Sequence, residues 1–270
     1  MQQIHFIAGL PRSGSTLLAA ILRQNPTFSA GMSSPVAMIF NQMLVATSRK
    51  NEAASMITVD HKKRLLKSIF TSYYEDHDGV VFDTNRIWPA KITALMQLFP
   101  ESRIICCVRE LGWILDSFER QVRNNPFDLS GIYGFDVGGT VVTRSANLTS
   151  NSGLVGFALD AIREAYFGEY AKQLILVEYE ALTKLPSDLI KMLYGLLDLP
   201  PFEHDFNNVE YNADEFDIAL GSPGLHTVKK KVEYVERQTI LPPNLFNSMK
   251  QQEFWRDPAA NKHDVTVISY

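Results

Sequence analysis

Residues Ile4–Thr16, with the sequence IHFIAGLPRSGST, decide the fold of this 270-residue chain. The apolar run Ile4–Ala8 stops at Gly9-Leu10-Pro11, which predicts a short buried strand followed by a tight turn. A helical pattern of apolar residues then begins near Ser13. The glycine spacing in this segment, G-x-x-x-x-G-x-[ST], is that of a phosphate-binding P-loop placed between a strand and a helix.

The residues of this turn have the properties of an anion site. Gly9 and Gly14 let the backbone turn tightly, so that amide groups converge in front of the helix N-terminus. Three side chains add hydroxyl donors and one adds a positive charge: Ser13, Ser15, Thr16 and Arg12. Since Ser15 stands where ATPases and GTPases carry the P-loop lysine, ordinary ATP or GTP hydrolysis is disfavoured.

Outward from this segment, short apolar runs alternate with helical patterns along most of the chain. The alternation predicts an α/β fold of the P-loop type, with three layers, a central parallel sheet and helices on both faces. We expect one domain over residues 1–270. The predicted strands are Ile4–Ala8, Val80–Asp83, Arg103–Val108 and Leu174–Val177.

Several helices are expected between these strands. Residues 35–48 have a helical pattern, and Asp60 is the predicted N-cap of the next helix. Trp88-Pro89 starts another, and Ser187–Leu197 reads as a capped helix. Residues 128–156 differ, because they are rich in Gly, Ser, Thr and Asn with weak periodicity, and we expect a lid or loop on the acceptor side of the site.

Composition limits the partners and the compartment. The formal net charge of −4 does not favour a nucleic-acid surface, so any anionic ligand requires a local basic site. The two cysteines, Cys106 and Cys107, are adjacent in an apolar run and are expected to be small core residues in a reducing compartment. The N-terminus lacks a signal-peptide pattern, and no apolar run has the length of a membrane span, so a cytoplasmic protein is expected.

At the P-loop the chain resembles the PAPS-dependent sulfotransferase superfamily, especially its bacterial and carbohydrate- or tyrosyl-protein-type branches. The segment from Pro11 to Leu17, PRSGSTL, is similar to the 5′-phosphosulfate loop of that family. The resemblance implies that Pro11, Arg12, Ser13, Gly14, Ser15 and Thr16 bind the donor, 3′-phosphoadenosine 5′-phosphosulfate (PAPS). Its product would be adenosine 3′,5′-bisphosphate (PAP).

Further segments extend the resemblance. Arg109 and Ser117 match the family residues that hold the 3′-phosphate, and Arg109 is expected at the carboxyl edge of the sheet because it ends a strand. Tyr179, in VEYEAL, resembles a tyrosine that packs near the adenosine. Lys229 and Lys230 resemble a C-terminal basic loop that returns to the 3′-phosphate.

The expected chemistry is in-line transfer of a sulfuryl group to an acceptor hydroxyl, without a required metal. Arg12 is expected to stabilise charge on the departing phosphate, and Arg86 to hold the sulfuryl oxygens. The bases of the related branches have no counterpart here. Asp83, at the end of a strand, is the first candidate, and Glu119 and His226 are the others.

Two other functions compete with this interpretation. A P-loop kinase is suggested by Val80–Asp83, which resembles the strand and aspartate that position magnesium. The missing P-loop lysine argues against a kinase. A kinase also requires magnesium, so magnesium dependence distinguishes the two functions. A noncatalytic nucleotide-binding module would keep the donor motifs without a base. The identity of the acceptor does not follow from the sequence.

Overall fold

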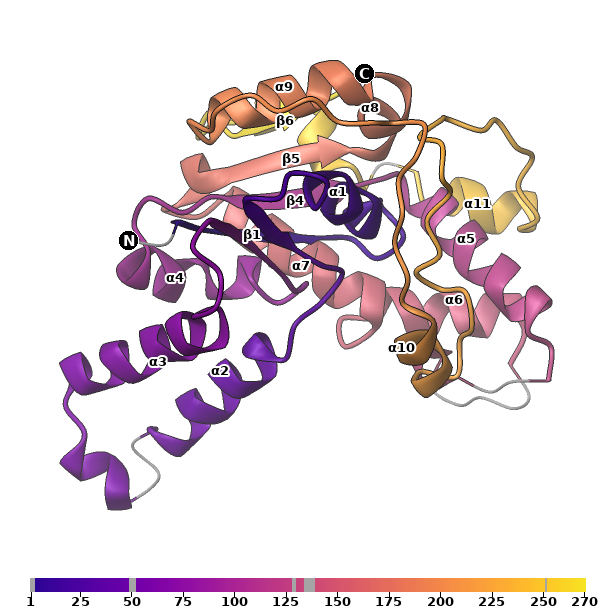
Figure 1. Cartoon of the computed structure of the whole chain (residues 1–270). Coiled ribbons are helices and arrows are strands. Elements are labelled where there is room, and N and C mark those ends of the chain that lie inside the picture. Colours follow the sequence, from indigo (N-terminus) through magenta and orange to yellow (C-terminus); the bar gives the residue numbers. More distant parts are fainter. Residues whose placement is uncertain (1–2, 49–51, 128–129, 134–138, 251) are drawn as a thin grey trace.

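A computed structural model of the chain describes residues 3–48, 52–127, 130–133, 139–250 and 252–270. Its centre is a six-stranded, wholly parallel sheet with the strand order β2-β3-β1-β4-β5-β6 (Figure 1). The strands are β1 (Gln3–Gly9), β2 (Phe28–Ala30), β3 (Val80–Thr84), β4 (Ile104–Val108), β5 (Leu174–Glu178) and β6 (Thr266–Ile268). The predicted α/β class and the four predicted strands are confirmed.

The register fixes where the strands end. Strand β1 lies between β3 and β4, with Ile7 opposite Thr84 on one side and Gly9 opposite Cys107 on the other. The chain fills one side of β1 with β2 and β3 before it crosses to β4. The loop after β1 therefore lies at the point where the strand order reverses, which is where open α/β sheets bind ligands.

The alternation of side chains along each strand divides the core into two layers. Phe6, Ala8 and Cys106 face one layer, while Ile7 and Cys107 face the other. Helices α1, α8 and α9 cover the second layer, and α2, α3, α4, α5 and α7 cover the first (Figure 1). Both cysteines are fully buried and reduced, as expected for core residues.

The helices have the following bounds: α1 Ser15–Leu22, α2 Val36–Ala46, α3 Val59–Tyr73, α4 Ile92–Leu98, α5 Leu111–Asn124, α6 Val141–Thr149, α7 Leu154–Tyr166, α8 Tyr179–Lys184, α9 Pro186–Leu196, α10 Asp214–Ala219 and α11 Pro243–Ser248. Short 3-10 helices occupy Glu52–Met56, Pro89–Lys91, Gly131–Tyr133, Ala171–Gln173, Phe254–Arg256 and Pro258–Ala260.

Two local predictions were wrong, and the lid or loop expected over residues 128–156 stays a prediction, although that segment is not irregular throughout. Helix α3 is capped by the hydroxyl of Thr58, which accepts from the amide of His61, and Asp60 lies in its first turn. Helix α9 begins with Pro186 and has no side-chain cap. Residues 128–156 contain α6, whose Thr140 cap accepts from the amide of Thr143, although residues 128–129 and 134–138 lie outside the described part.

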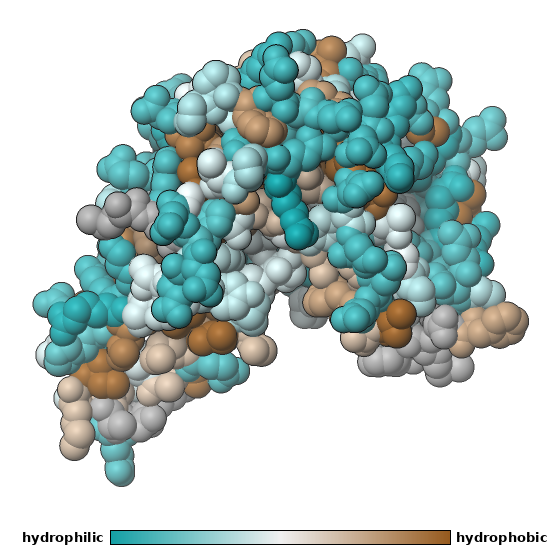
Figure 2. All heavy atoms as spheres, viewed as in Figure 1, coloured by the Kyte–Doolittle hydropathy of each residue, from teal (hydrophilic) through white to brown (hydrophobic). Residues whose placement is uncertain are grey.

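Two projections flank the body of the molecule. Helices α2 and α3 pack side by side and extend away from the sheet, and α10 lies on the other side (Figure 1). The space-filling view is hollowed between them (Figure 2). No helix in the described ranges is both long and apolar enough to cross a membrane.

Candidate active site

A cavity of about 480 Å³ opens at the carboxyl ends of β1, β3 and β4. Its walls come from the β1–α1 loop, the residues after β3 and β4, helices α5 and α8, and the segment from Phe216 to Arg237. Parallel strands bring segments that are distant in the sequence to one edge of the sheet, so the predicted phosphate loop and Arg109 lie on the same cavity.

The phosphate loop is fastened to the end of β4. The amide of Leu10 donates to the carbonyl of Cys107 at 2.9 Å. Gly9 has a φ of 130°, and a Cβ there would lie 2.1 Å from the same carbonyl oxygen, so only glycine fits. The loop continues through Arg12, which has a φ of 61°, and Gly14, which has a φ of 98°, directly into α1.

One predicted donor contact is corrected here. The Ser13 hydroxyl is fully buried and donates to the carbonyls of Leu10 and Cys107 within the loop. It stabilises the turn and does not line the cavity, whereas Pro11, Arg12, Gly14, Ser15 and Thr16 do.

Arg12 connects the phosphate loop to the second predicted motif. Its Nε donates to the hydroxyl of Ser117 on α5 at 3.0 Å. Its own carbonyl accepts from Nη1 of Arg109 at 3.4 Å. The three residues that the resemblance assigned to the two phosphates of the donor therefore lie in one contiguous group.

Arg109 is a buried cation that forms no ion pair with a carboxylate of the described residues. Its guanidinium stacks on the ring of Tyr179, 3.9 Å from the ring centre, and Tyr179 in turn packs against Gly14. The residue is 8% exposed, and among the described residues its Nε has no hydrogen-bond partner. Burial lowers the pKa of Arg109 from its ordinary value, yet arginine stays protonated in proteins. A buried guanidinium with an unused donor beside a cavity indicates an anion site.

The basic loop is only partly where it was predicted. Lys229 lines the cavity, but Lys230 does not: it is exposed and lies 3.8 Å from Glu210. Two cations that the sequence analysis missed, Lys231 and Arg237, also line the cavity. The buried carboxylate of Asp116 on α5 holds Arg237 at 3.0 Å and accepts from the amide of Ile240 at 2.8 Å, which fixes the chain over the site.

Asp83, the first candidate base, lies on the other face of β3. Its carboxylate is fully buried and accepts from Ser34 Oγ at 2.6 Å, Tyr74 Oη at 2.7 Å and Trp88 Nε1 at 2.8 Å. Burial raises its pKa, and the three hydrogen bonds oppose that shift. Since it does not line the cavity, we interpret Asp83 as a structural carboxylate.

The residues after Asp83 do reach the cavity, because strand side chains alternate. Thr84 lines it and has a buried hydroxyl without a described partner. Asn85 and Arg86 follow on the same edge. Arg86 has no ion pair with any described carboxylate, so its charge is available to a ligand.

Of the two other base candidates, Glu119 is already neutralised. Its oxygens lie 2.8 Å from Arg144 Nη2 and 3.1 Å from Arg123 Nε, and it does not line the cavity.

His226, in contrast, lines the cavity and is oriented by Asp217 of α10. The buried carboxylate of Asp217 accepts from the backbone amide of His226 at 2.8 Å and lies 2.5 Å from its Nδ1. This contact leaves Nε2 as the proton-accepting nitrogen. Desolvation lowers the pKa of His226, and the positive charges of Arg12 and Arg86 lower it further. The hydrogen bond and the charge of Asp217 raise this pKa and oppose them. The imidazole is therefore neutral at pH 7 and close to both arginines.

The charge of the cavity is opposite to that of the chain. Its described lining contains one carboxylate, Glu233, and the following cations: Arg12, Arg86, Arg109, Lys229, Lys231 and Arg237. The whole chain has a net charge of −4. A concentration of positive charge inside an acidic protein indicates a ligand with several negative charges.

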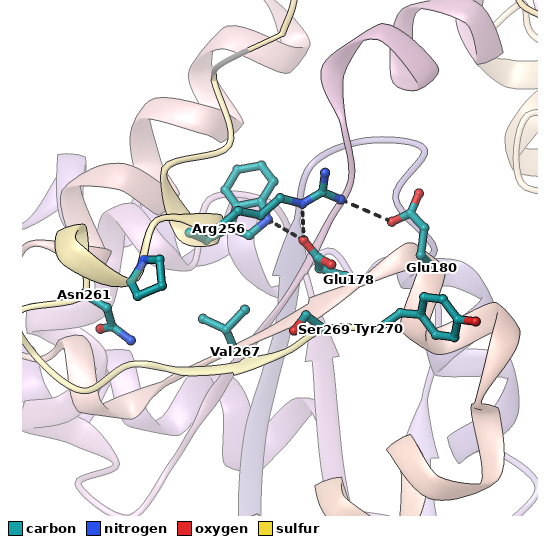
Figure 3. Close-up of a pocket in the computed structure, with 9 residues that line it drawn as sticks. Glu178, Glu180, Arg256, Asn261, Val267, Ser269 and Tyr270 are labelled. Carbon is teal, nitrogen blue, oxygen red and sulfur yellow. Dashed lines mark hydrogen bonds and ion pairs between the residues drawn. The ribbon is translucent and has the colours of Figure 1, made fainter.

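A second cavity, of about 560 Å³, has the opposite character (Figure 3). It lies between the end of β5 and the C-terminal segment. Its basic lining residue, Arg256, is neutralised by Glu178 at 2.5 Å and faces Glu180 at 3.7 Å, and Trp255 Nε1 donates to Glu178 at 3.0 Å (Figure 3). This cluster fastens the C-terminal segment to the sheet and offers no free charge to an anion.

Comparison with known proteins agrees with the class that this site defines, an α/β transferase with an anion-binding loop. The model of the Sulfotransferase family matches residues 5–204, and the chain belongs to that family. No curated protein matches the chain.

Several solved structures are similar to this chain. The sulfotransferase domain from the curacin biosynthetic pathway is 16% identical, with a TM-score of 0.54 over 94% of this chain and 92% of that domain. A sulfotransferase from Alicyclobacillus acidocaldarius is 13% identical, with a TM-score of 0.49 over 76% of this chain and 84% of that protein. The sulfotransferase domain of the Synechococcus PCC 7002 olefin synthase is 18% identical, with a TM-score of 0.45 over 93% and 89%.

Proposed function

We propose that this sulfotransferase uses PAPS as its donor and transfers the sulfuryl group to an acceptor hydroxyl. The observation that carries the proposal is the buried Arg109 guanidinium, stacked on Tyr179 with an unused Nε, next to the phosphate loop. Two anionic groups of one nucleotide fit this arrangement. The loop amides take the 5′-phosphosulfate, while Arg109 and Ser117 take the 3′-phosphate.

The remaining cations complete the donor site. Lys229 and Lys231 approach from the C-terminal segment, and Arg237 is held there by Asp116. Tyr179 offers an aromatic face near the loop, as the resemblance implies for the adenosine side. The excess of positive charge matches the several negative charges of PAPS, which an acidic chain would otherwise repel.

The bound donor supplies a sulfuryl group whose sulfur bonds to the acceptor oxygen while the bond to the bridging oxygen of the 5′-phosphate breaks, and the electron pair stays on that phosphate. His226 Nε2 accepts the proton of the acceptor hydroxyl as the new bond forms. Asp217 stabilises the resulting imidazolium through Nδ1. Arg12 and the loop amides stabilise the charge on the bridging oxygen, and Arg86 holds the sulfuryl oxygens.

The donor assignment is tested by calorimetric titration with PAP and with AMP, which lacks the 3′-phosphate. Arg109→Ala should weaken PAP binding by about 1.5–3 kcal/mol, the value of a charge-assisted contact, and leave AMP binding nearly unchanged. Lys230→Ala is the matched control, because Lys230 is exposed outside the cavity. Equal losses for the two nucleotides, or no PAP binding to the wild type, would overturn the donor assignment.

A further inference from the structure

The cavity lining also includes a group of apolar side chains. Six lining residues belong to this group, which we call the apolar wall: Met32, Ile132, Leu154, Phe216, Leu220 and Leu225. Four of them, Ile132, Leu154, Leu220 and Leu225, belong to or pack against the main hydrophobic core, so these four are supported from behind. The segment predicted to be an acceptor-side lid supplies Ile132 and Leu154.

Phe216 is the most exposed member of the wall. Its side chain is 43% exposed, yet its ring lies edge-on against the imidazole of His226, with the ring centres 5.6 Å apart. A molecule whose hydroxyl reaches His226 must therefore place its adjoining atoms against Phe216. Covering a half-exposed aromatic ring with an apolar group is favourable, whereas covering it with unpartnered hydroxyls is not.

The polar partners left for an acceptor are limited. Beyond the residues assigned to the donor and to the transfer, the described lining offers Ser33, Thr84, Asn85, Thr183, Thr227 and Glu233, and Glu233 is paired with Lys231. A sugar would bring many hydroxyls, and most of them would face the apolar wall without partners. Each unpaired polar group that is buried on binding costs affinity, so such a site discriminates against polyhydroxylated acceptors.

We infer that the acceptor is an alcohol or phenol whose hydroxyl is attached to an apolar body, and that Phe216 sets this specificity. This inference rests on the proposed function, since it names the acceptor of the same reaction. The apolar body lies on the wall, the hydroxyl points to His226 Nε2, and the donor occupies the basic half of the cavity. Phe216 acts as a specificity residue and takes no part in proton transfer.

The first test compares kcat/KM for n-butanol, n-hexanol and n-octanol, with methyl β-glucoside as the hydrophilic acceptor. Burial of each methylene group should raise kcat/KM about three- to fourfold along the alcohol series. The glucoside should be a poorer acceptor than n-hexanol, which has a similar number of carbon atoms. A flat alcohol series, or preference for the glucoside, would overturn the inference and leave the transferase function intact.

The second test uses variants on one helix. Phe216→Ala should lower kcat/KM for n-butanol and n-octanol by about tenfold or more, mostly through KM, and change methanol, which has no methylene chain to pack on the ring, by no more than about twofold. Phe216→Leu should recover part of the loss. Ile218→Ala is the matched control, because Ile218 lies on the same helix, is 66% exposed and does not line the cavity. An equal loss for methanol and the longer alcohols would mean that Phe216 only supports His226.

A binding measurement separates failure of the inference from failure of the proposed function. Titration of n-octanol into PAP-loaded protein should give saturable binding that Phe216→Ala weakens and Ile218→Ala does not. If PAP binds but n-octanol does not, the acceptor class is wrong and the donor site stands. If PAP itself does not bind, the proposed function fails first.

Discussion

Arg12 illustrates how one residue joins binding to chemistry. It sits in the phosphate loop with a left-handed φ of 61°, and its Nε donates to Ser117. The fork of the guanidinium is thereby held in place before the donor arrives. The bridging oxygen gains negative charge only as its bond to sulfur breaks, so the charge of Arg12 stabilises the transition state more than the bound donor. Interactions that strengthen in the transition state affect the rate more than the ground-state affinity.

Arg12→Ala should therefore lower the single-turnover rate about a hundred- to a thousandfold, while donor affinity falls less because the loop amides remain. Arg12→Lys should recover part of the rate, since it restores the charge but not the planar fork. Ser117→Ala is the comparison that removes the hydrogen bond to Arg12, together with the proposed 3′-phosphate contact, but keeps the charge of Arg12. A variant that binds the donor many times more weakly but transfers at the normal rate when saturated would assign Arg12 to binding only.

Asp83 illustrates why position in a strand matters more than residue type. Its carboxylate accepts from Ser34, Tyr74 and Trp88, and removing it would take this acceptor from the buried indole of Trp88 and from two half-buried hydroxyls. Asp83→Ala should lower the free energy of unfolding by about 3 kcal/mol in urea denaturation. Asp76→Ala, at an exposed aspartate on the same segment, should have little effect.

The folded fraction of Asp83→Ala should keep kcat within a few-fold of the wild type. The opposite result, a stable protein without turnover, would return Asp83 to the role of base. Its position at the end of a predicted strand suggests that role, but adjacent strand residues face opposite sides of the sheet. Thr84 faces the cavity, and Asp83 faces the core.

At the scale of elements, the sequence predicts strands that are clear apolar runs and misses elements that are short or have a weak pattern. Strands β1, β3, β4 and β5 are apolar runs, and each was identified. Strands β2 and β6 have three residues each, too few for a pattern to distinguish them from loops. Helix α6 was missed because its sequence, VVTRSANLT, is half polar and follows a glycine-rich segment.

The same limit explains why Asp217 was missed as the partner of His226, which was itself a candidate base. Arg12, Arg109 and Ser117 follow strands in recognisable motifs. Asp217 and His226 are nine residues apart, and a turn containing Gly221 and Gly224, both with positive φ, folds the chain back so that the two side chains meet. No periodicity marks such a pair, although a turn between an aspartate and a histidine is a weak signal.

Helix α10 positions the proposed base through Asp217, which gives a prediction for pH dependence. The pKa of His226 is lowered, so its neutral form is present at pH 7 and is lost only as the pH falls below that pKa. The kcat/KM profile should therefore rise with pH to a plateau, with its inflection below the ordinary histidine value of 6.5. His226→Gln should lower kcat by about a hundred- to ten-thousandfold and remove this acidic limb.

Two further variants distinguish orientation from proton transfer. Asp217→Asn should lower kcat and shift the inflection to lower pH, because the carboxylate favours the protonated imidazole. His61→Gln, at an exposed histidine of α3, should leave the profile unchanged. An acidic limb that persists in His226→Gln would show that another group accepts the proton.

At the scale of the whole molecule, two fields act on the donor. The chain has a net charge of −4 and repels an anion at long range, while six cations in the cavity attract it at short range. Salt screens contacts inside a cavity less than charges on the surface. This cavity is open to solvent, however, so salt should still weaken the attraction between its cations and the donor. The short-range attraction should dominate, because the cations lie closest to the donor.

Raising ionic strength from about 0.1 M to about 1 M shortens the screening length from about 10 Å to about 3 Å. The dissociation constant of PAP should therefore rise steeply with salt, and that of AMP less, because AMP lacks the phosphate held by Arg109. Apolar acceptors should bind equally well or better at high salt, since their contact with the wall carries no charge. Calorimetric titrations of PAP, AMP and n-octanol across this range measure all three slopes. Equal slopes for PAP and AMP would show that the buried guanidinium of Arg109 does not contact the 3′-phosphate, and a falling affinity for n-octanol would place the acceptor on the basic half of the cavity.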